Sequence, residues 1–259
     1  MVNTPTATVA GWPRFGQEFL DFLRFVARPD FARLPGRRAQ DGWREDWFPR
    51  MRLGRLFQWA GLLWLINLVV LGPIAVAAAG LGGAEHRLRL DNIPWLQAVL
   101  WAPLVEELVF RYGLRRLGQL WWLLPASLCA LLIGPSALTM ALVALILFAC
   151  WWPQLQQRPS DHAQVAVRFR LRYRKHFFWV LHLSCLAFAA IHLGNFSYTS
   201  TPLWVLPLLV LPQWLTGLVL AWIRVRRGFG AAVALHGIFN AGPLLIVWLV
   251  LSSVSGLPS

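Results

Sequence analysis

Seven apolar stretches dominate this chain, and each is long enough, or nearly so, to cross a membrane. A helix needs about 20 residues to span roughly 30 Å of hydrocarbon. The stretches cover residues 57–80, 93–114, 119–135, 136–155, 176–195, 202–223 and 229–252. Only 14% of the 259 residues are charged, against about 25% in a soluble domain. The sequence therefore predicts an all-α, polytopic membrane helix bundle of about seven transmembrane helices.

The sequence divides into three expected segments. They are a cytoplasmic or interfacial segment over 1–56, the transmembrane bundle over 57–252, and a tail over 253–259. In the first, residues 12–27 carry phenylalanines on one helical face and charged side chains on the other, which predicts an amphipathic helix on the membrane surface. The basic residues that follow, over 28–55, are expected to be irregular. In the bundle, the turn signal at 134–136 makes 119–155 an expected helical hairpin.

The basic residues set an orientation for this bundle. Net charge is +13, and of the 24 Lys and Arg residues only Lys175 is a lysine. Four clusters fall on one side of the predicted bundle: Arg50, Arg52 and Arg55; Arg115 and Arg116; Arg168 to Lys175; and Arg224, Arg226 and Arg227. The positive-inside rule then places the N-terminus in the cytoplasm and the C-terminus outside. Anionic lipids are the expected partner of this Arg-rich face, rather than nucleic acid, and the Arg-rich composition indicates a bacterial cytoplasmic membrane.

Polar residues inside three of the apolar stretches suggest a functional site, because an ionisable group at mid-membrane costs a few kcal/mol or more. Glu107 and Arg111 lie four positions apart, the favoured order for a helical ion pair. Glu106 points about 100° away from Glu107 around the helix, so it is the carboxylate left to face a wet cavity. Pro103 is expected to bend or open this helix beside that cavity.

Histidines on two later stretches complete the set. His236 and Asn240 share a helical face, where both can donate hydrogen bonds to a developing oxyanion. Phe188 lies one turn before His192 and is expected to pack against its imidazole. A structural ion pair is an equal alternative for the glutamate motif alone, and a lone membrane histidine such as His182 more often bonds a neighbouring helix. The co-occurrence of the three motifs in order favours catalysis.

These residues resemble the three motifs of the CPBP membrane protease family, also called Abi, which contains CAAX prenyl endopeptidases and bacteriocin-processing proteins. The matching segments are Glu106-Glu107-Leu-Val-Phe-Arg111, Phe188-Ala-Ala-Ile-His192 and His236-Gly-Ile-Phe-Asn240, on expected helices 93–114, 176–195 and 229–252. The resemblance implies a glutamate-dependent intramembrane endopeptidase without an obligatory metal, which cleaves a peptide or membrane-anchored precursor.

The resemblance also implies a role for each residue. Glu106 would be the general base that activates water, His192 would assist it, and His236 with Asn240 would stabilise the oxyanion. Glu107 and Arg111 would support the site. The hairpin 119–155 and the basic loop 156–175 depart from the family pattern and put substrate access in question. A count of about 1.5 Å per residue also places His192 nearer the outer face than Glu106 and His236. Either its helix is tilted or starts deeper, or the set is not a single site.

Three alternatives remain open at this level. Glu106, His192 and His236 form a reasonable zinc-ligand set, so a zinc-dependent version of the protease is not excluded. The Arg-rich N-terminal segment and the extra hairpin also suit a non-catalytic scaffold or an immunity or regulatory protein that binds a peptide or a sensor partner. A proton-coupled transporter is disfavoured, because the sequence has no inverted repeat and no further acids for a relay.

Overall fold

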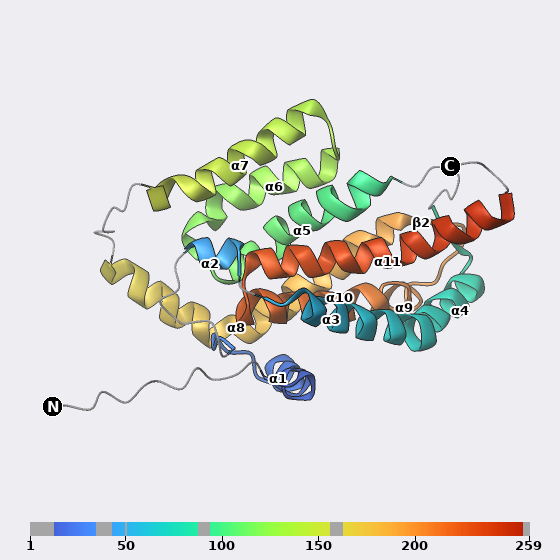
Figure 1. Cartoon of the computed structure of the whole chain (residues 1–259), viewed down its shortest axis with the longest axis horizontal. Helices are drawn as coiled ribbons and strands as arrows, with labels where there is room; N and C mark the ends of the chain where they lie inside the picture. The colour runs from blue at the N-terminus through green and yellow to red at the C-terminus, as the bar shows by residue number, and fades with distance from the viewer. Residues whose placement is uncertain (1–12, 35–42, 50, 88–93, 156–162, 256–259) are drawn as a thin grey trace.

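The computed structural model describes residues 13–34, 43–49, 51–87, 94–155 and 163–255, and its architecture is a mostly helical bundle (Figure 1). The α-helices are α1 (Phe15–Ala27), α2 (Trp43–Trp47), α3 (Leu53–Ile66), α4 (Gly72–Gly82), α5 (Ala102–Phe110), α6 (Leu120–Ile133), α7 (Ala137–Leu155), α8 (Ala163–Ile191), α9 (Leu206–Leu209), α10 (Leu211–Arg226) and α11 (Phe229–Ser255). The π- and 3₁₀-helical turns are η1 (Asn67–Leu71), η2 (Gln97–Trp101), η3 (Tyr112–Leu114), η4 (Leu117–Gln119) and η5 (His192–Asn195). The expectation of an all-α chain needs one exception, since β1 (Ala84–His86) and β2 (Phe196–Tyr198) form a small antiparallel ribbon.

Several helices of this bundle are long and apolar enough to cross a membrane. Within the described residues these are Leu53–Gly82, Phe169–Asn195 and Phe229–Val250, with a fourth if the bent pair Gln97–Leu114 and Leu117–Ile133 is one span. That pair is bent by 118°. The chain is therefore an integral membrane protein, while the count of seven spans stays a prediction.

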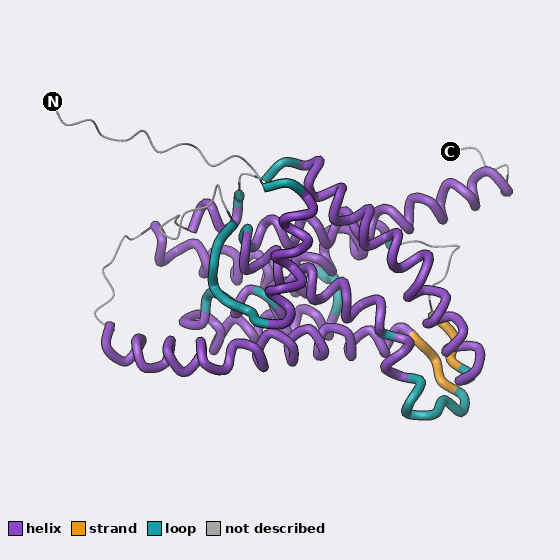
Figure 2. Tube along the Cα trace, turned by 90° about the horizontal axis from the view of Figure 1, so that it is seen from below, coloured by secondary structure: helices purple, strands orange, loops and turns teal. Residues whose placement is uncertain are grey.

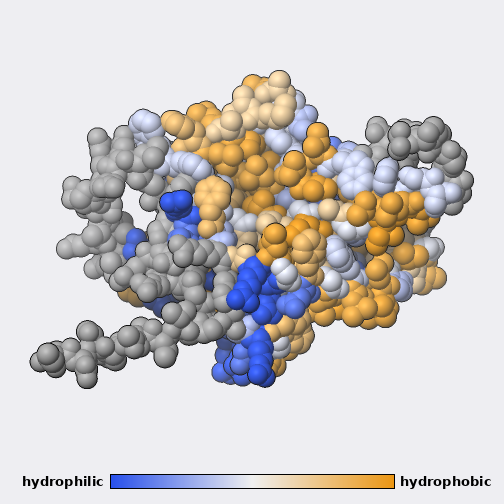
Figure 3. Space-filling model, viewed as in Figure 1, coloured by the Kyte–Doolittle hydropathy of each residue, from blue (hydrophilic) through white to orange (hydrophobic). Residues whose placement is uncertain are grey.

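The main helices of the bundle lie roughly along one common axis. Figure 1 shows α3, α5, α10 and α11 along the long axis, with the α6–α7 hairpin stacked against α5 on one side. Seen from below, the β1–β2 ribbon lies at one end of the bundle (Figure 2). The core is aromatic at its centre, where the rings of Trp59 and Trp222 are 4.7 Å apart. Hydrophobic side chains form much of the coloured surface of the face seen in Figure 3, as a lipid-facing surface requires.

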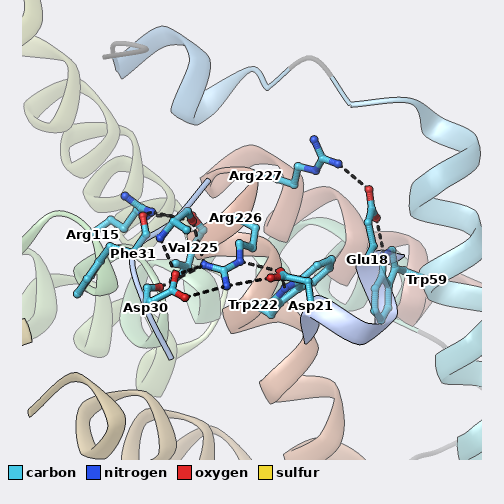
Figure 4. Close-up of polar contacts among 11 residues, drawn as sticks. Glu18, Asp21, Asp30, Phe31, Trp59, Arg115, Trp222, Val225, Arg226 and Arg227 are labelled. Atoms are coloured by element: carbon cyan, nitrogen blue, oxygen red, sulfur yellow. Dashed lines mark hydrogen bonds and ion pairs between the residues drawn. The ribbon is translucent and has the colours of Figure 1, made fainter. Parts of the chain in front are cut away.

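The N-terminal amphipathic helix is present, and it packs on the bundle through Phe22 and Phe25 together with the acidic Glu18. α1 begins at Phe15 rather than at residue 12 and crosses the bundle helices, so that Figure 1 shows it nearly end-on. Glu18 is fully buried, whereas Leu20 and Leu23 are exposed. Glu18 accepts hydrogen bonds from Arg227 at 2.6 Å and from the Trp59 indole at 3.2 Å (Figure 4). Both aromatic packing and ion pairing therefore hold α1 on the bundle, and the apolar pattern alone did not reveal the ion pairing.

Arg226 forms a second set of ion pairs between the N-terminal segment and the bundle. Its guanidinium donates to Asp21 at 2.8 Å and to Asp30 at 2.6 Å (Figure 4). Burial alone would raise the pKa of Asp30, but hydrogen bonds from Arg226 and the backbone N–H of Ala32 outweigh it and lower that pKa below its ordinary value. A lowered carboxyl pKa stabilises the folded state at neutral pH and ceases to do so only in strong acid. These ion pairs are therefore intact at physiological pH.

Three segments that were expected to be loops or irregular contain helix. Residues 156–175 were expected to form a basic loop, but α8 already begins at Ala163, and only 156–162 lie outside the described residues. Arg224, Arg226 and Arg227 were expected in a loop between two spans, yet they form the end of α10 and are buried. Residues 28–55, expected to be irregular, contain α2 and the start of α3. For the end of α10, ion pairs with the N-terminal segment override a local composition that resembles a solvated loop.

Candidate active site

The glutamate motif lies in the last turn of α5. Arg111 caps the helix, and its guanidinium is 2.8 Å from Oε1 of Glu107, with both side chains fully buried. The expected ion pair is therefore confirmed. Glu106 lies on a different side of the helix and keeps 8% of its surface exposed. Its Oε2 has no hydrogen-bond partner among the described residues, so one carboxylate is paired and the other is open.

His236 lies between the two carboxylates. Its Nδ1 is 3.1 Å from Oε1 of Glu107, and its Nε2 is 3.7 Å from Oε2 of Glu106. Because the Glu107 carboxylate is already paired with Arg111, it acts as the acceptor and Nδ1 carries the proton. Nε2 is thereby directed toward Glu106. This contact joins α5 to α11 across 129 positions of sequence.

Phe188 is the packing centre of the site. The Arg111 guanidinium lies 3.7 Å from the centre of its ring, a distance at which the ring stabilises the cation. The His192 ring packs 4.8 Å away and the His236 ring 5.8 Å away, both edge-on. The expected contact of Phe188 with His192 is confirmed, and the same ring also orders Arg111 and His236.

His192 is the first residue of η5, where α8 ends. Its Nδ1 is 2.7 Å from the carbonyl oxygen of Phe188. A carbonyl only accepts, so Nδ1 donates, and in the neutral imidazole Nε2 carries the lone pair. His192 lies within electrostatic range of both Glu106 and His236. The histidine that seemed too near the outer face therefore lies beside the other two groups.

Asn240 is fixed by an irregular turn of the neighbouring helix. Its Nδ2 donates to the carbonyl oxygen of Ala98 at 2.8 Å. Ala98 belongs to the π-helical turn η2, in which the N–H of Ala102 bonds the carbonyl of Gln97, five positions earlier. In that pattern the carbonyl of Ala98 would pair with residue 103, but Pro103 has no N–H to donate. The freed carbonyl holds one N–H of Asn240, and the second N–H of the amide remains for another acceptor.

The lack of a side chain at Gly237 lets α11 lie close to η2, so a larger residue there should destabilise the protein. A Cβ built at Gly237 would lie 2.9 Å from the backbone oxygen of Val99. Gly237→Ala is therefore expected to push α11 away from η2, to break the contact of Asn240 with Ala98, and to cost about 1–3 kcal/mol of stability. Gly80→Ala on α4, where no atom lies within 4 Å, is the matched control. Thermal unfolding of both purified variants in detergent checks this, and equal melting temperatures would contradict it.

Sequence reasoning missed one residue that holds the site in place. Arg224 is fully buried on α10 and donates to the backbone carbonyls of Arg111 at 3.1 Å and Tyr112 at 3.2 Å. It also pairs with Asp46 at 2.8 Å. Arg224 thus satisfies the end of α5 that carries the glutamate motif. Its neighbours Arg226 and Arg227 gave it the appearance of a loop residue. His182, by contrast, contacts the carbonyl oxygen of Val26 at 3.0 Å, the helix-to-helix bond expected of it.

Comparison with known proteins finds a family model that resembles part of this chain. Residues 162–242 match the model of the type II CAAX prenyl endopeptidase Rce1-like proteins. The match covers less than half of the chain, and it shows that this part of the chain is similar to the Rce1-like proteins. No curated protein and no solved structure matches the chain. The Rce1-like region contains Phe188, His192, His236 and Asn240, whereas the glutamate motif precedes it.

The geometry joins the Rce1-like region to the residues outside it. Glu106 and Glu107 both contact His236, and Arg111 contacts Phe188. The similarity to the Rce1-like proteins is consistent with a peptidase, and the acid, imidazole and amide groups of the site are the types that peptide hydrolysis requires.

Proposed function

We propose that this chain is an intramembrane endopeptidase in which Glu106 activates a water molecule for attack on a peptide bond. His192 assists by accepting a hydrogen bond from that water at Nε2. His236 and Asn240 donate to the oxyanion of the tetrahedral intermediate. Glu107, Arg111 and Phe188 hold these groups in position.

The proposed reaction follows from which groups of the site can carry or accept a proton. Glu106 takes a proton from water as the oxygen attacks the carbonyl carbon, and it then gives this proton to the leaving nitrogen when the C–N bond breaks. His236 donates to the oxyanion from Nε2 only when that nitrogen is protonated, because Nδ1 is held by Glu107. Asn240 contributes the N–H that Ala98 leaves free.

One observation carries the proposal. The open carboxylate of Glu106 lies beside the Nε2 of His236 at 3.7 Å, with an oxygen that no described residue satisfies. A buried carboxylate oxygen without a partner is costly unless a water or a substrate occupies the position next to it. Glu107 also has one buried oxygen without a partner, Oε2, but its Oε1 is held by Arg111 at 2.8 Å and by His236 at 3.1 Å, whereas no described residue comes as close to Oε2 of Glu106. This contrast favours chemistry at Glu106.

A zinc-dependent reaction is the alternative within the same enzyme class. Among the described residues no three His, Cys, Asp or Glu side chains are grouped to hold a metal ion, so the metal-free reaction is the version we propose. Elemental analysis of the purified protein, with activity assayed in chelator, separates the two. A stoichiometric metal whose removal abolishes cleavage would overturn the metal-free version.

The proposed setting is a bacterial cytoplasmic membrane, with the N-terminus in the cytoplasm and the C-terminus outside. It rests on the Arg-rich end of the bundle, where α1 crosses the other helices and leaves Leu20 and Leu23 exposed, side chains that an interface would bury. Anionic lipids are the proposed partners of this end. A peptide or membrane-anchored precursor is the proposed substrate, and the family name makes a prenylated CAAX peptide the first to try.

Cleavage of a farnesylated CAAX peptide by proteoliposomes tests the proposal. We expect mass spectrometry to show release of the three C-terminal residues by the wild type, with no loss of rate in chelator. The scaffold alternative has a genetic test. If Glu106→Gln restored the phenotype of a deletion strain as fully as the wild-type gene, a binding role would replace the enzymatic one.

A further inference from the structure

Two amide side chains within the bundle have polar atoms that the protein leaves unsatisfied. Both Nδ2 and Oδ1 of Asn67 are buried without a hydrogen-bond partner in the described part of the chain, as is Oε1 of Gln213. In hydrocarbon such a group costs free energy that no bulk water repays. Buried polar atoms of this kind are normally satisfied by water or by a ligand. The two amides therefore mark a space that something polar occupies.

Gln213 lies on the face of α10 that packs against the site. It is one turn before Gly217, and residues four apart share a helical face. A Cβ built at Gly217 would lie 3.1 Å from Cδ1 of Phe188 and 3.3 Å from Nη2 of Arg111. The face that carries Gln213 is therefore the face against which Phe188 and Arg111 lie.

The direction of the neighbouring helix places Gln213 at the level of His192. Helices α8 and α10 are antiparallel, because Gly217 meets Phe188 while Arg224, later on α10, is within electrostatic range of Tyr173, earlier on α8. One turn back along α10 from Gly217 therefore corresponds to one turn forward along α8 from Phe188. That step leads to Gln213 on one helix and His192 on the other.

Asn67, the first residue of η1 directly after α3, borders the same polar layer. The rings of Trp59 and Trp222 are in contact at 4.7 Å, and Asn67 lies about two turns beyond Trp59 on the same helical face. It therefore opposes the N-terminal part of α10, close to Gln213 in height. The Trp64 indole donates to the carbonyl oxygen of Phe239, immediately before Asn240. Asn67 follows Trp64 by less than one turn, so it lies slightly beyond Asn240 along the bundle.

We infer that Gln213 is a substrate-binding residue whose Oε1 accepts a hydrogen bond from a main-chain N–H of an extended peptide, with Asn67 bordering the same subsite. The inference rests on the proposed peptidase function. An amide side chain donates and accepts in the same plane, so it matches the N–H and C=O of an extended peptide without reading its side chains. The subsite lies next to His192, where the peptide bond to be cleaved must be presented to the activated water.

Binding of a fluorescent farnesylated CAAX peptide to protein in nanodiscs tests the inference. The parent for all variants is Glu106→Gln, which keeps the peptide intact, and fluorescence anisotropy gives the Kd. Gln213→Met removes the acceptor but preserves volume, and we expect it to weaken binding about five- to ten-fold, the value of one hydrogen bond. Gln213→Glu retains an acceptor oxygen and is expected to bind within about two-fold of the parent.

Thr216→Val is the matched control on the same helix, because its hydroxyl already donates to the carbonyl oxygen of Pro212 at 2.9 Å. Its Kd is expected to equal that of the parent. Since the readout is binding, it is independent of whether the wild type cleaves the probe, which tests the proposed function separately. Gln213→Met binding as tightly as the parent, or Thr216→Val weakening binding as much as Gln213→Met, would overturn the inference.

Discussion

Glu106→Gln is expected to remove peptide cleavage while leaving the fold intact. The amide keeps the size of the side chain but cannot accept a proton from water, so kcat should fall about 10²–10⁴-fold. Glu106 has an oxygen without a partner, and its contact with His236 is 3.7 Å, longer than a hydrogen bond. Removal of its charge should therefore cost little stability. Rates of cleavage in proteoliposomes and melting temperatures in detergent measure the two effects.

The neighbouring glutamate provides the matched contrast. Glu107→Gln weakens the buried pair with Arg111 and the contact with His236, and breaking a buried pair costs about 3–5 kcal/mol. Its melting temperature should fall clearly below that of Glu106→Gln. Glu85→Gln on the exposed ribbon should change neither rate nor stability. If Glu106→Gln melted as low as Glu107→Gln, Glu106 would be a structural residue.

Arg224→Ala is expected to be the most destabilising of the single substitutions considered. It leaves Asp46 without its closest cation and removes the donors to the carbonyls of Arg111 and Tyr112. Loss of one partner of a buried ion pair costs about 3–5 kcal/mol, and the two carbonyls, which keep only their backbone donors Leu114 and Arg115, add to it. Protein yield after detergent extraction and the melting temperature are the measurements.

Two further variants define what Arg224 contributes. Arg224→Lys keeps the charge but cannot bridge Asp46 and two carbonyls with one fork of donors, so its stability should be intermediate. Arg174→Ala, an exposed residue on α8, should melt like the wild type. If Arg224→Ala melted at the same temperature as Arg174→Ala, Arg224 on α10 would not stabilise the C-terminal end of α5.

Local spacing predicted the contacts that lie within one helix. The pairing of Glu107 with Arg111 and the packing of Phe188 on His192 both follow from residues four apart, and both are present. The contact of His236 with Glu107 does not follow from any spacing, because it depends on how α5 and α11 dock. For the same reason a count of residues along α8 could not decide whether His192 lies near the other groups, since that depends on where α8 packs.

Charge patterns were a less reliable guide than apolar ones. Arg224 and Arg227 occur in a basic cluster that is typical of a cytoplasmic loop, yet they are buried against Asp46 and Glu18. The acids that pair with them lie in the N-terminal 56 residues, about 180–210 positions away in sequence. Composition records that a charge is present but not that a distant segment folds back to neutralise it. The orientation derived from these arginines consequently remains a prediction.

The most direct test of the central claim is a double-mutant cycle between Glu106 and His192. The claim is that residues from separate helices act on one water molecule at one site. Cleavage of the farnesylated peptide is measured for the wild type, Glu106→Gln, His192→Ala and the double variant. Groups that act as a unit are strongly non-additive, so the double variant should lose no more activity than the more damaged single one. Losses that multiply would show that the two residues act independently and that the four do not form a single site.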